Sequence, residues 1–175
     1  MDNSAKKICM NTLFENINSG AEFSDDRKYR YALWRIWNPK LPLVMFIGLN
    51  PSTASEDKND PTINRVCQIA KNNGYGGVYM MNCFSLVSTD PEILQEVYDC
   101  LHEEEDIKNM RWLLEVRRKC SDVVFAWGNF KIVEQRAKFI TVHFKDAKAL
   151  HINKNGSPKH PLYCKSDSKL IPFKK

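Results

Sequence analysis

An unbroken apolar run at residues 43–47, Leu-Val-Met-Phe-Ile, constrains the fold more than any other part of the chain. A strand with one face in water alternates apolar and polar residues, so a continuous run predicts a strand that is covered on both faces. Such a strand needs covering elements on either side of its sheet, and helices are the usual ones. The run therefore indicates the centre of an α/β protein.

Strands and helices are predicted to alternate along the chain after this run. Apolar segments at 77–82, 122–128 and 148–152 predict strands, and segments at 60–74, 103–119 and 132–144 have helical spacing. Asp-Pro pairs at 60–61 and 90–91 are expected helix starts, because Asp caps a helix and Pro suits its first position. We expect a three-layer α/β/α fold with a central, mainly parallel four-stranded sheet.

The N-terminal part of the chain predicts one further strand. Residues 28–37 are rich in aromatic side chains and precede Asn38-Pro39, which favours an antiparallel strand at the sheet edge. Residues 1–27 are polar and predict an extension or a short helix around 8–17. With 175 residues and no internal repeat, residues 1–175 are expected to form a single domain with its core at 28–165.

Composition argues against several classes of protein. No apolar stretch approaches the roughly 20 residues of a membrane-spanning helix, and the N-terminus lacks the apolar core of a signal peptide. We therefore expect a cytoplasmic protein without a membrane partner. None of the 6 cysteines forms a C-x-x-C pair, so we expect buried, reduced thiols and no metal. The usual glycine-rich nucleotide loops do not occur, and we expect no cofactor.

The charge distribution is uneven, with a net charge of +5 for the whole chain. From residue 129 onward the acidic residues are Glu134, Asp146 and Asp167, and lysines and arginines far outnumber them. A basic face would attract the phosphates of a nucleic acid. A solvated lysine surface without a partner is the alternative interpretation.

Polar or small residues follow several predicted strands. Asn50 comes after the first apolar run, Asn82 ends the next strand, Trp127-Gly128 ends a third, and His160 lies between prolines after the fourth. In parallel sheets, ligands bind beyond the carboxyl ends of the strands. We therefore expect these four positions to share one site.

Each candidate residue has a structural and a chemical interpretation. Asn50-Pro51 can be a turn, or the Asn50 amide can orient a water molecule without removing its proton. Asn82 can bond its own backbone, or its carboxamide can bind the edge of a base. His160 can be structural, or it can stabilise negative charge on a departing group by a fixed hydrogen bond.

Five short segments carry a resemblance to a known family. They are 48–54 (Gly-Leu-Asn-Pro-Ser-Thr-Ala), 60–62 (Asp-Pro-Thr), 82–84 (Asn-Cys-Phe), 126–128 (Ala-Trp-Gly) and 156–163 (Gly-Ser-Pro-Lys-His-Pro-Leu-Tyr). In their order and spacing they resemble the bacterial domain-of-unknown-function family 1643. The resemblance extends over residues 29–163, which is most of the chain.

More remotely, the same landmarks are similar to those of the uracil-DNA glycosylase superfamily. That resemblance implies a glycosylase-like fold, a role in DNA repair, and three residue roles: Asn50 holds water, Asn82 recognises the base and His160 stabilises the leaving group. Ser52 stands where some members carry a bulky tyrosine, which implies room for a larger base. The residues expected to contact substrate are Gly48, Leu49, Pro51, Ser52, Asn82, Trp127 and Gly128.

These observations lead to one hypothesis and two alternatives. We expect a glycosylase-like hydrolase that acts on the N-glycosidic bond of a nucleobase, in nucleic acid or in a nucleotide-related compound. The first alternative is a non-catalytic module that binds nucleic acid or a modified base in the same pocket. The second is hydrolysis of an unrelated small molecule. A polymeric substrate would have to present its base unpaired or flipped out.

Overall fold

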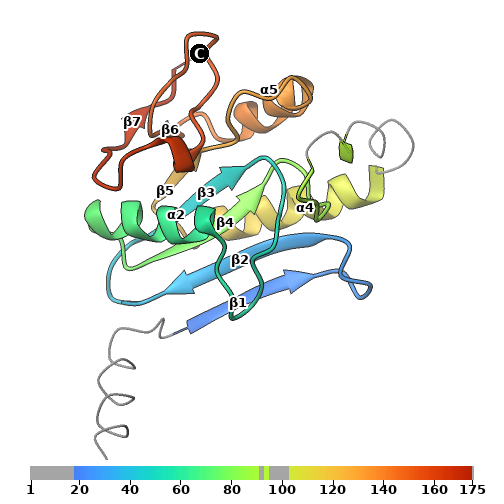
Figure 1. Ribbon diagram of the computed structural model, residues 1–175, viewed down its shortest axis with the longest axis horizontal. Helices are drawn as coiled ribbons and strands as arrows, with labels where there is room; N and C mark the ends of the chain where they lie inside the picture. Colours follow the sequence, from blue (N-terminus) through green and yellow to red (C-terminus); the bar gives the residue numbers. More distant parts are fainter. Residues whose placement is uncertain (1–17, 91–92, 95–102, 175) are drawn as a thin grey trace, which may run out of the picture.

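The computed structural model describes residues 18–90, 93–94 and 103–174, and its described part forms a seven-stranded sheet with helices on both faces (Figure 1). The strand order is β1-β2-β4-β3-β5-β6-β7. The strands are β1 (Asn18–Phe23), β2 (Arg30–Ile36), β3 (Leu43–Gly48), β4 (Gly77–Asn82), β5 (Asp122–Phe125), β6 (Lys148–Ala149) and β7 (Ile171–Pro172). The helices are α2 (Pro61–Asn72), α4 (Glu103–Arg117) and α5 (Val133–His143). The predicted α/β class is confirmed.

The sheet contains both parallel and antiparallel strand pairs, in different parts. Central β3 pairs in parallel with β4 and with β5, and β5 pairs in parallel with β6. The pairs β1–β2, β2–β4 and β6–β7 are antiparallel. Within the residues described, the sheet is therefore larger and more mixed than the predicted four-stranded sheet with one added edge strand.

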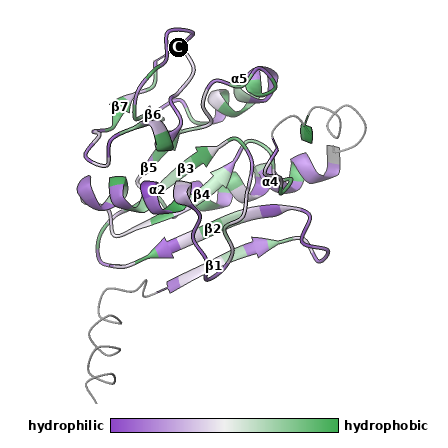
Figure 2. Cartoon of the chain, viewed as in Figure 1, coloured by the Kyte–Doolittle hydropathy of each residue, from purple (hydrophilic) through white to green (hydrophobic). Residues whose placement is uncertain are grey.

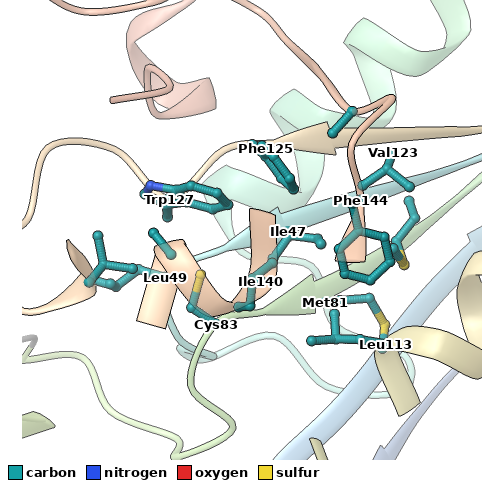
Figure 3. Packing of buried hydrophobic residues seen from close by; sticks show 14 of the residues in the cluster. Ile47, Leu49, Met81, Cys83, Leu113, Val123, Phe125, Trp127, Ile140 and Phe144 are labelled. Atoms are coloured by element: carbon teal, nitrogen blue, oxygen red, sulfur yellow. The ribbon is translucent and has the colours of Figure 1, made fainter. Parts of the chain in front are cut away.

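The central strand β3 is buried on both faces, as its apolar run predicts. Val44 and Phe46 pack into the cluster that contains α2, whereas Met45 and Ile47 pack into the opposite cluster with α4 and α5. Hydrophobic residues concentrate on the central strands in Figure 2. Figure 3 shows Ile47 beside Met81, Leu113 and Ile140 in the second cluster. This packing fixes the strand ends that form the site.

The N-terminal region differs from its prediction. Residues 18–23 form β1, although they were expected to belong to a polar extension or a short helix. Because β1 lies outside β2, the strand at 30–36 is an inner strand and not the edge strand that was predicted. The sequence of β1 is polar and contains Gly20, so its extended form comes from hydrogen bonding to β2 and not from its own pattern. The helix predicted around 8–17 and Pro91 of the expected helix start at 90–91 lie outside the described residues.

Helix α2 begins as the sequence predicts. The Asp60 side chain accepts a hydrogen bond from the Ile63 amide at 2.8 Å, and Pro61 occupies the first turn. The helix ends at the C-cap Asn73, and Gly74 follows with a φ of 84°, a left-handed conformation that favours glycine. Capping thus holds Asp60 at the N-terminus of α2, beside the ends of β3 and β4.

Candidate functional site

A cavity of about 190 Å³ lies at the carboxyl ends of β3 and β4. Six of the nine residues predicted for the site line it: Gly48, Leu49, Asn50, Ser52, Asn82 and His160. These residues come from three segments that are remote in sequence. Parallel pairing of Gly48 with Asn82 brings the first two segments together, and the loop after β6 supplies His160.

Gly48 leaves room for the Asn82 side chain. A Cβ added at Gly48 would lie 2.9 Å from Asn82 Oδ1 and 2.6 Å from Met80 Cε. Any larger residue at position 48 would push into the carboxamide. Glycine is therefore required here because the two side chains approach closely.

The Asn50 amide is oriented by backbone carbonyls. Its Nδ2 donates to Ser88 O at 2.8 Å, to Pro51 O at 3.0 Å and to Leu86 O at 3.4 Å. Because carbonyl oxygens only accept, this network identifies the NH₂ end of the amide and leaves Oδ1 as its other end. Within the described part of the chain, Oδ1 has no hydrogen-bond donor, so it is free to accept one from a water molecule or a ligand.

Asn82 carries an unsatisfied donor. The residue is 2% exposed, and its Nδ2 has no partner among the residues described. Its backbone carbonyl accepts from Asn109 Nδ2 at 3.0 Å, a contact that holds the end of β4. Buried polar groups in native proteins nearly always have partners. Because Asn82 also lines the cavity, its unpaired amide N–H indicates a position for a ligand acceptor.

His160 has a defined tautomer when neutral. The Leu162 amide donates to Nδ1 at 3.3 Å, which leaves Nε2 as the protonated nitrogen. Burial lowers the pKa of His160 below its ordinary value, and the nearby negative charge of Asp60 partly opposes that shift. At neutral pH the ring is therefore a neutral hydrogen-bond donor through Nε2.

Gly128 packs closely against His160. Its φ of 80° favours glycine, and a Cβ there would lie 3.3 Å from the Cβ of His160. The Gly128 amide also donates to Pro158 O at 3.0 Å, which ties the end of the β5 segment to the His160 loop. Gly128 is predicted to contact substrate, but it lies outside the cavity and lines a neighbouring hollow instead.

Two other residues named for the site lie outside the cavity. Trp127 is buried in the core, where its ring centroid lies 4.6 Å from that of Phe125 (Figure 3). Pro51 is also buried, and its carbonyl accepts from Asn50 Nδ2 and from the Ser88 amide. Both residues therefore support the surrounding structure and do not line the cavity.

Two charged residues, Arg30 and Asp60, also line the cavity, although neither was predicted to belong to the site. Arg30 is 3% exposed, and Asp60, expected only as a helix cap, faces the same space. Asp60 is the one carboxylate among the described residues that line the cavity. The available signal was Arg30 itself, because a charged residue at the start of a largely apolar strand needs a buried partner or a ligand.

The mouth of the cavity is apolar and partly exposed. Phe130, Leu162 and Tyr163 line it, and Tyr163 is 75% exposed beside the His160 ring. Phe130, His160 and Tyr163 also line a second hollow of about 450 Å³, whose wall includes Lys154 and Lys159. The mouth thus offers flat rings for stacking and nearby lysines for negative charge.

The described residues contain no group of three or more His, Cys, Asp or Glu side chains that is placed to hold a metal. Cys67, Cys83, Cys120 and Cys164 are free thiols, and burial raises the pKa of Cys67 to about 11 and that of Cys120 to about 12. Such thiols are poor nucleophiles at neutral pH. In the part of the chain described, no helix is long and apolar enough to cross a membrane.

Comparison with known proteins identifies the family of this chain. The comparisons with curated proteins and with solved structures gave no match. A family model described as "Protein of unknown function (DUF1643)" matches residues 30–162, which include every cavity residue discussed above except Tyr163. The chain is a member of the DUF1643 family.

Proposed function

We propose that the cavity is the active site of a glycosylase-like hydrolase, which cleaves an N-glycosidic bond in nucleic acid or in a nucleotide-related compound. One observation carries the proposal: Asn50, Asn82 and His160 line a single small cavity, and among the described residues Asn50 Oδ1, Asn82 Nδ2 and His160 Nε2 have no hydrogen-bond partner. These are the groups needed to position water, bind a base edge and stabilise a leaving group. The motif resemblance to the uracil-DNA glycosylase superfamily assigns the same three roles.

In this mechanism the bond between the base nitrogen and the sugar carbon breaks first. The bonding electrons leave with the base, and the sugar gains oxocarbenium character. His160 Nε2–H donates a hydrogen bond to the acceptor atom on which negative charge develops, and it stays neutral throughout. Asn82 Nδ2 donates to a second acceptor on the base edge.

Water completes the reaction. Asn50 Oδ1 accepts a hydrogen bond from a water molecule and directs its oxygen toward the sugar carbon. The hydroxyl group adds to that carbon, and the remaining proton leaves with solvent or the released base. Because an amide cannot take the proton itself, the reaction depends on a base that leaves readily as an anion.

The test is a screen of oligonucleotides and free nucleosides with altered bases, scored for base release. We expect wild-type protein to release at least one base. His160→Gln and Asn50→Ala should each reduce the rate by about 10²-fold. His151→Gln is the matched control, because His151 is exposed and does not line the cavity. Equal rates for His160→Gln and His151→Gln would contradict the role of His160.

A non-catalytic binding module is the second candidate, and the Asn50 contacts favour it. An amide held by three carbonyls orients water but cannot activate it by removing a proton. This candidate predicts saturable binding of a modified base without release. It also predicts that Asn82→Ala weakens binding, whereas turnover is undetectable in every variant.

A further inference from the structure

Arg30 is a buried cation with few partners. Its Nη1 donates to Ala54 O at 2.8 Å. Nε has no hydrogen-bond partner in the described part of the chain, and the contacts there give Nη2 none. The residue is 3% exposed, and what remains accessible lines the cavity. Most of the guanidinium's donor capacity is therefore unused.

No carboxylate of the described residues lies within 4 Å of this guanidinium in an ion pair. Asp60 acts on Arg30 only at longer range, and Asp60 Oδ1 already accepts from the Ile63 amide. The N-terminus of α2 also offsets part of the Asp60 charge. Burial lowers the pKa of Arg30 to about 10, and the residue still carries its charge at neutral pH.

Leaving a buried charge without a partner is costly, so such a charge normally has a counter-ion or a function. Asn82 lines the same cavity, and its buried Nδ2 is a second donor without a partner among the described residues. Two such donors from adjacent strands, β2 and β4, indicate a ligand group that is rich in acceptors.

We propose that Arg30 binds an oxyanion, a carboxylate or phosphate group, carried by the small molecule that enters the cavity. The proposal deepens the proposed function, on which its choice of a nucleobase-containing ligand rests. Because Arg30 is almost wholly buried, an anion must enter the cavity to reach it. The internal phosphates of a polynucleotide would remain at the mouth, near Lys154 and Lys159. The substrate class is then an acidic base or a nucleoside monophosphate.

The experiment is calorimetric titration of the full chain with four probes. These are inorganic phosphate, acetate, a nucleoside 5′-monophosphate and a pyrimidine carboxylic acid, each at constant ionic strength. The variants are Arg30→Met, which keeps the bulk of the side chain but removes its charge, and Lys159→Met, a matched loss of charge in the neighbouring hollow. Comparing the monophosphate with the carboxylic acid identifies which oxyanion the site prefers.

We expect one-to-one binding of at least one probe, weakened about 30-fold or more in Arg30→Met and little changed in Lys159→Met. Arg30→Lys keeps the charge but loses the planar fork, so it should show an intermediate affinity. This second variant decides the question if Arg30→Met does not fold. Absence of saturable binding to wild-type protein, or equal weakening by Arg30→Met and Lys159→Met, would overturn the proposal.

The two proposals fail in different ways. Anion binding that depends on Arg30, without base release from any substrate, would contradict only the proposed hydrolase. Base release from neutral nucleosides at a rate unchanged in Arg30→Met would contradict only the anion site.

Discussion

The two ends of β2 each bury an arginine, and the two arginines behave differently. Arg35 is 1% exposed, and all three of its guanidinium nitrogens donate hydrogen bonds. Their acceptors include Asn59 Oδ1 at 2.8 Å and Ser55 O at 2.6 Å, so Arg35 holds the loop between β3 and α2. Arg30 reaches the neighbouring carbonyl of Ala54 with one nitrogen and leaves the rest of its donors unused among the residues described.

The comparison separates a structural cation from one that is available to a ligand. Both guanidiniums are desolvated, and burial lowers the pKa of each. The difference lies in the number of acceptors that surround them. A buried arginine with a complete set of acceptors stabilises its loop, whereas one with a single acceptor and a cavity beside it is suited to bind an anion.

The largest expected effect tests this difference directly. Arg35→Met removes the donors that bind Ser55 O and Asn59 Oδ1 and leaves these acceptors unpaired, so it should lower the free energy of unfolding by about 3 kcal/mol or more. Arg30→Met removes a buried charge without an ion pair among the described residues, and it should change stability by less than about 1 kcal/mol, or increase it. Urea unfolding monitored by circular dichroism measures both. Equal losses would remove the distinction between the two residues.

A smaller effect is expected at Asp60, which lies beside the Arg30 end of the strand. Asparagine caps a helix as well as aspartate does, so Asp60→Asn isolates the effect of the charge on α2 and on Arg30. We expect a loss of about 0.5–1 kcal/mol in the free energy of unfolding. The loss should shrink in an Arg30→Met background, as measured by a double-mutant cycle.

Asp57→Asn is the control for Asp60→Asn. It removes an exposed charge from the same loop, where the only hydrogen bond to Asp57 from the described residues comes from the Ser55 hydroxyl. Its effect should be independent of Arg30. Coupling of equal size at Asp57 and Asp60 would show that Arg30 responds to the general charge of the loop and not to Asp60.

The parallel centre of the fold was predictable because its signals are local. The apolar run of β3 and the Asp60-Pro61 start of α2 each lie within a few residues of sequence. The polar strand β1 and the two-residue strand β7, which contains Pro172, have no such pattern. They are extended because they pair with β2 and β6. The sequence of one strand alone does not reveal which segment it will pair with.

The asparagines and the histidine of the site were predicted from the sequence, but Arg30 was not. A β-bulge explains this omission. Alternation along a regular strand would place residues 30 and 35 on opposite faces of the sheet. Adjacent β1 residues Glu22 and Phe23 instead pair with Ala32 and Arg30, which leaves Tyr31 as an extra residue. The bulge reverses the alternation, and both arginines reach the same loop, at Ala54 and Ser55.

The smallest expected effect concerns the other ionisable group of the cavity, His160. Burial places the pKa of His160 below the value of 6.5 that an exposed histidine has, so the unfolded state binds its proton more readily. Its contribution to stability is therefore complete above pH 6.5 and is lost as pH falls through the lowered pKa. His160→Gln should flatten the dependence of unfolding free energy on pH between about 5 and 7, because Arg30 stays charged over this range.

Urea unfolding at several pH values checks the expectation, with His151→Gln as the control. His151 is exposed, so its substitution should leave the slope close to that of the wild-type protein. A ligand anion bound at Arg30 would place a negative charge in the cavity that His160 also lines, and it should raise the pKa of His160. Proton NMR of the imidazole, with and without phosphate, therefore measures whether the unused donors of Arg30 and the histidine serve the same ligand. A pKa that is unchanged by phosphate in wild-type protein would show that the two groups act separately.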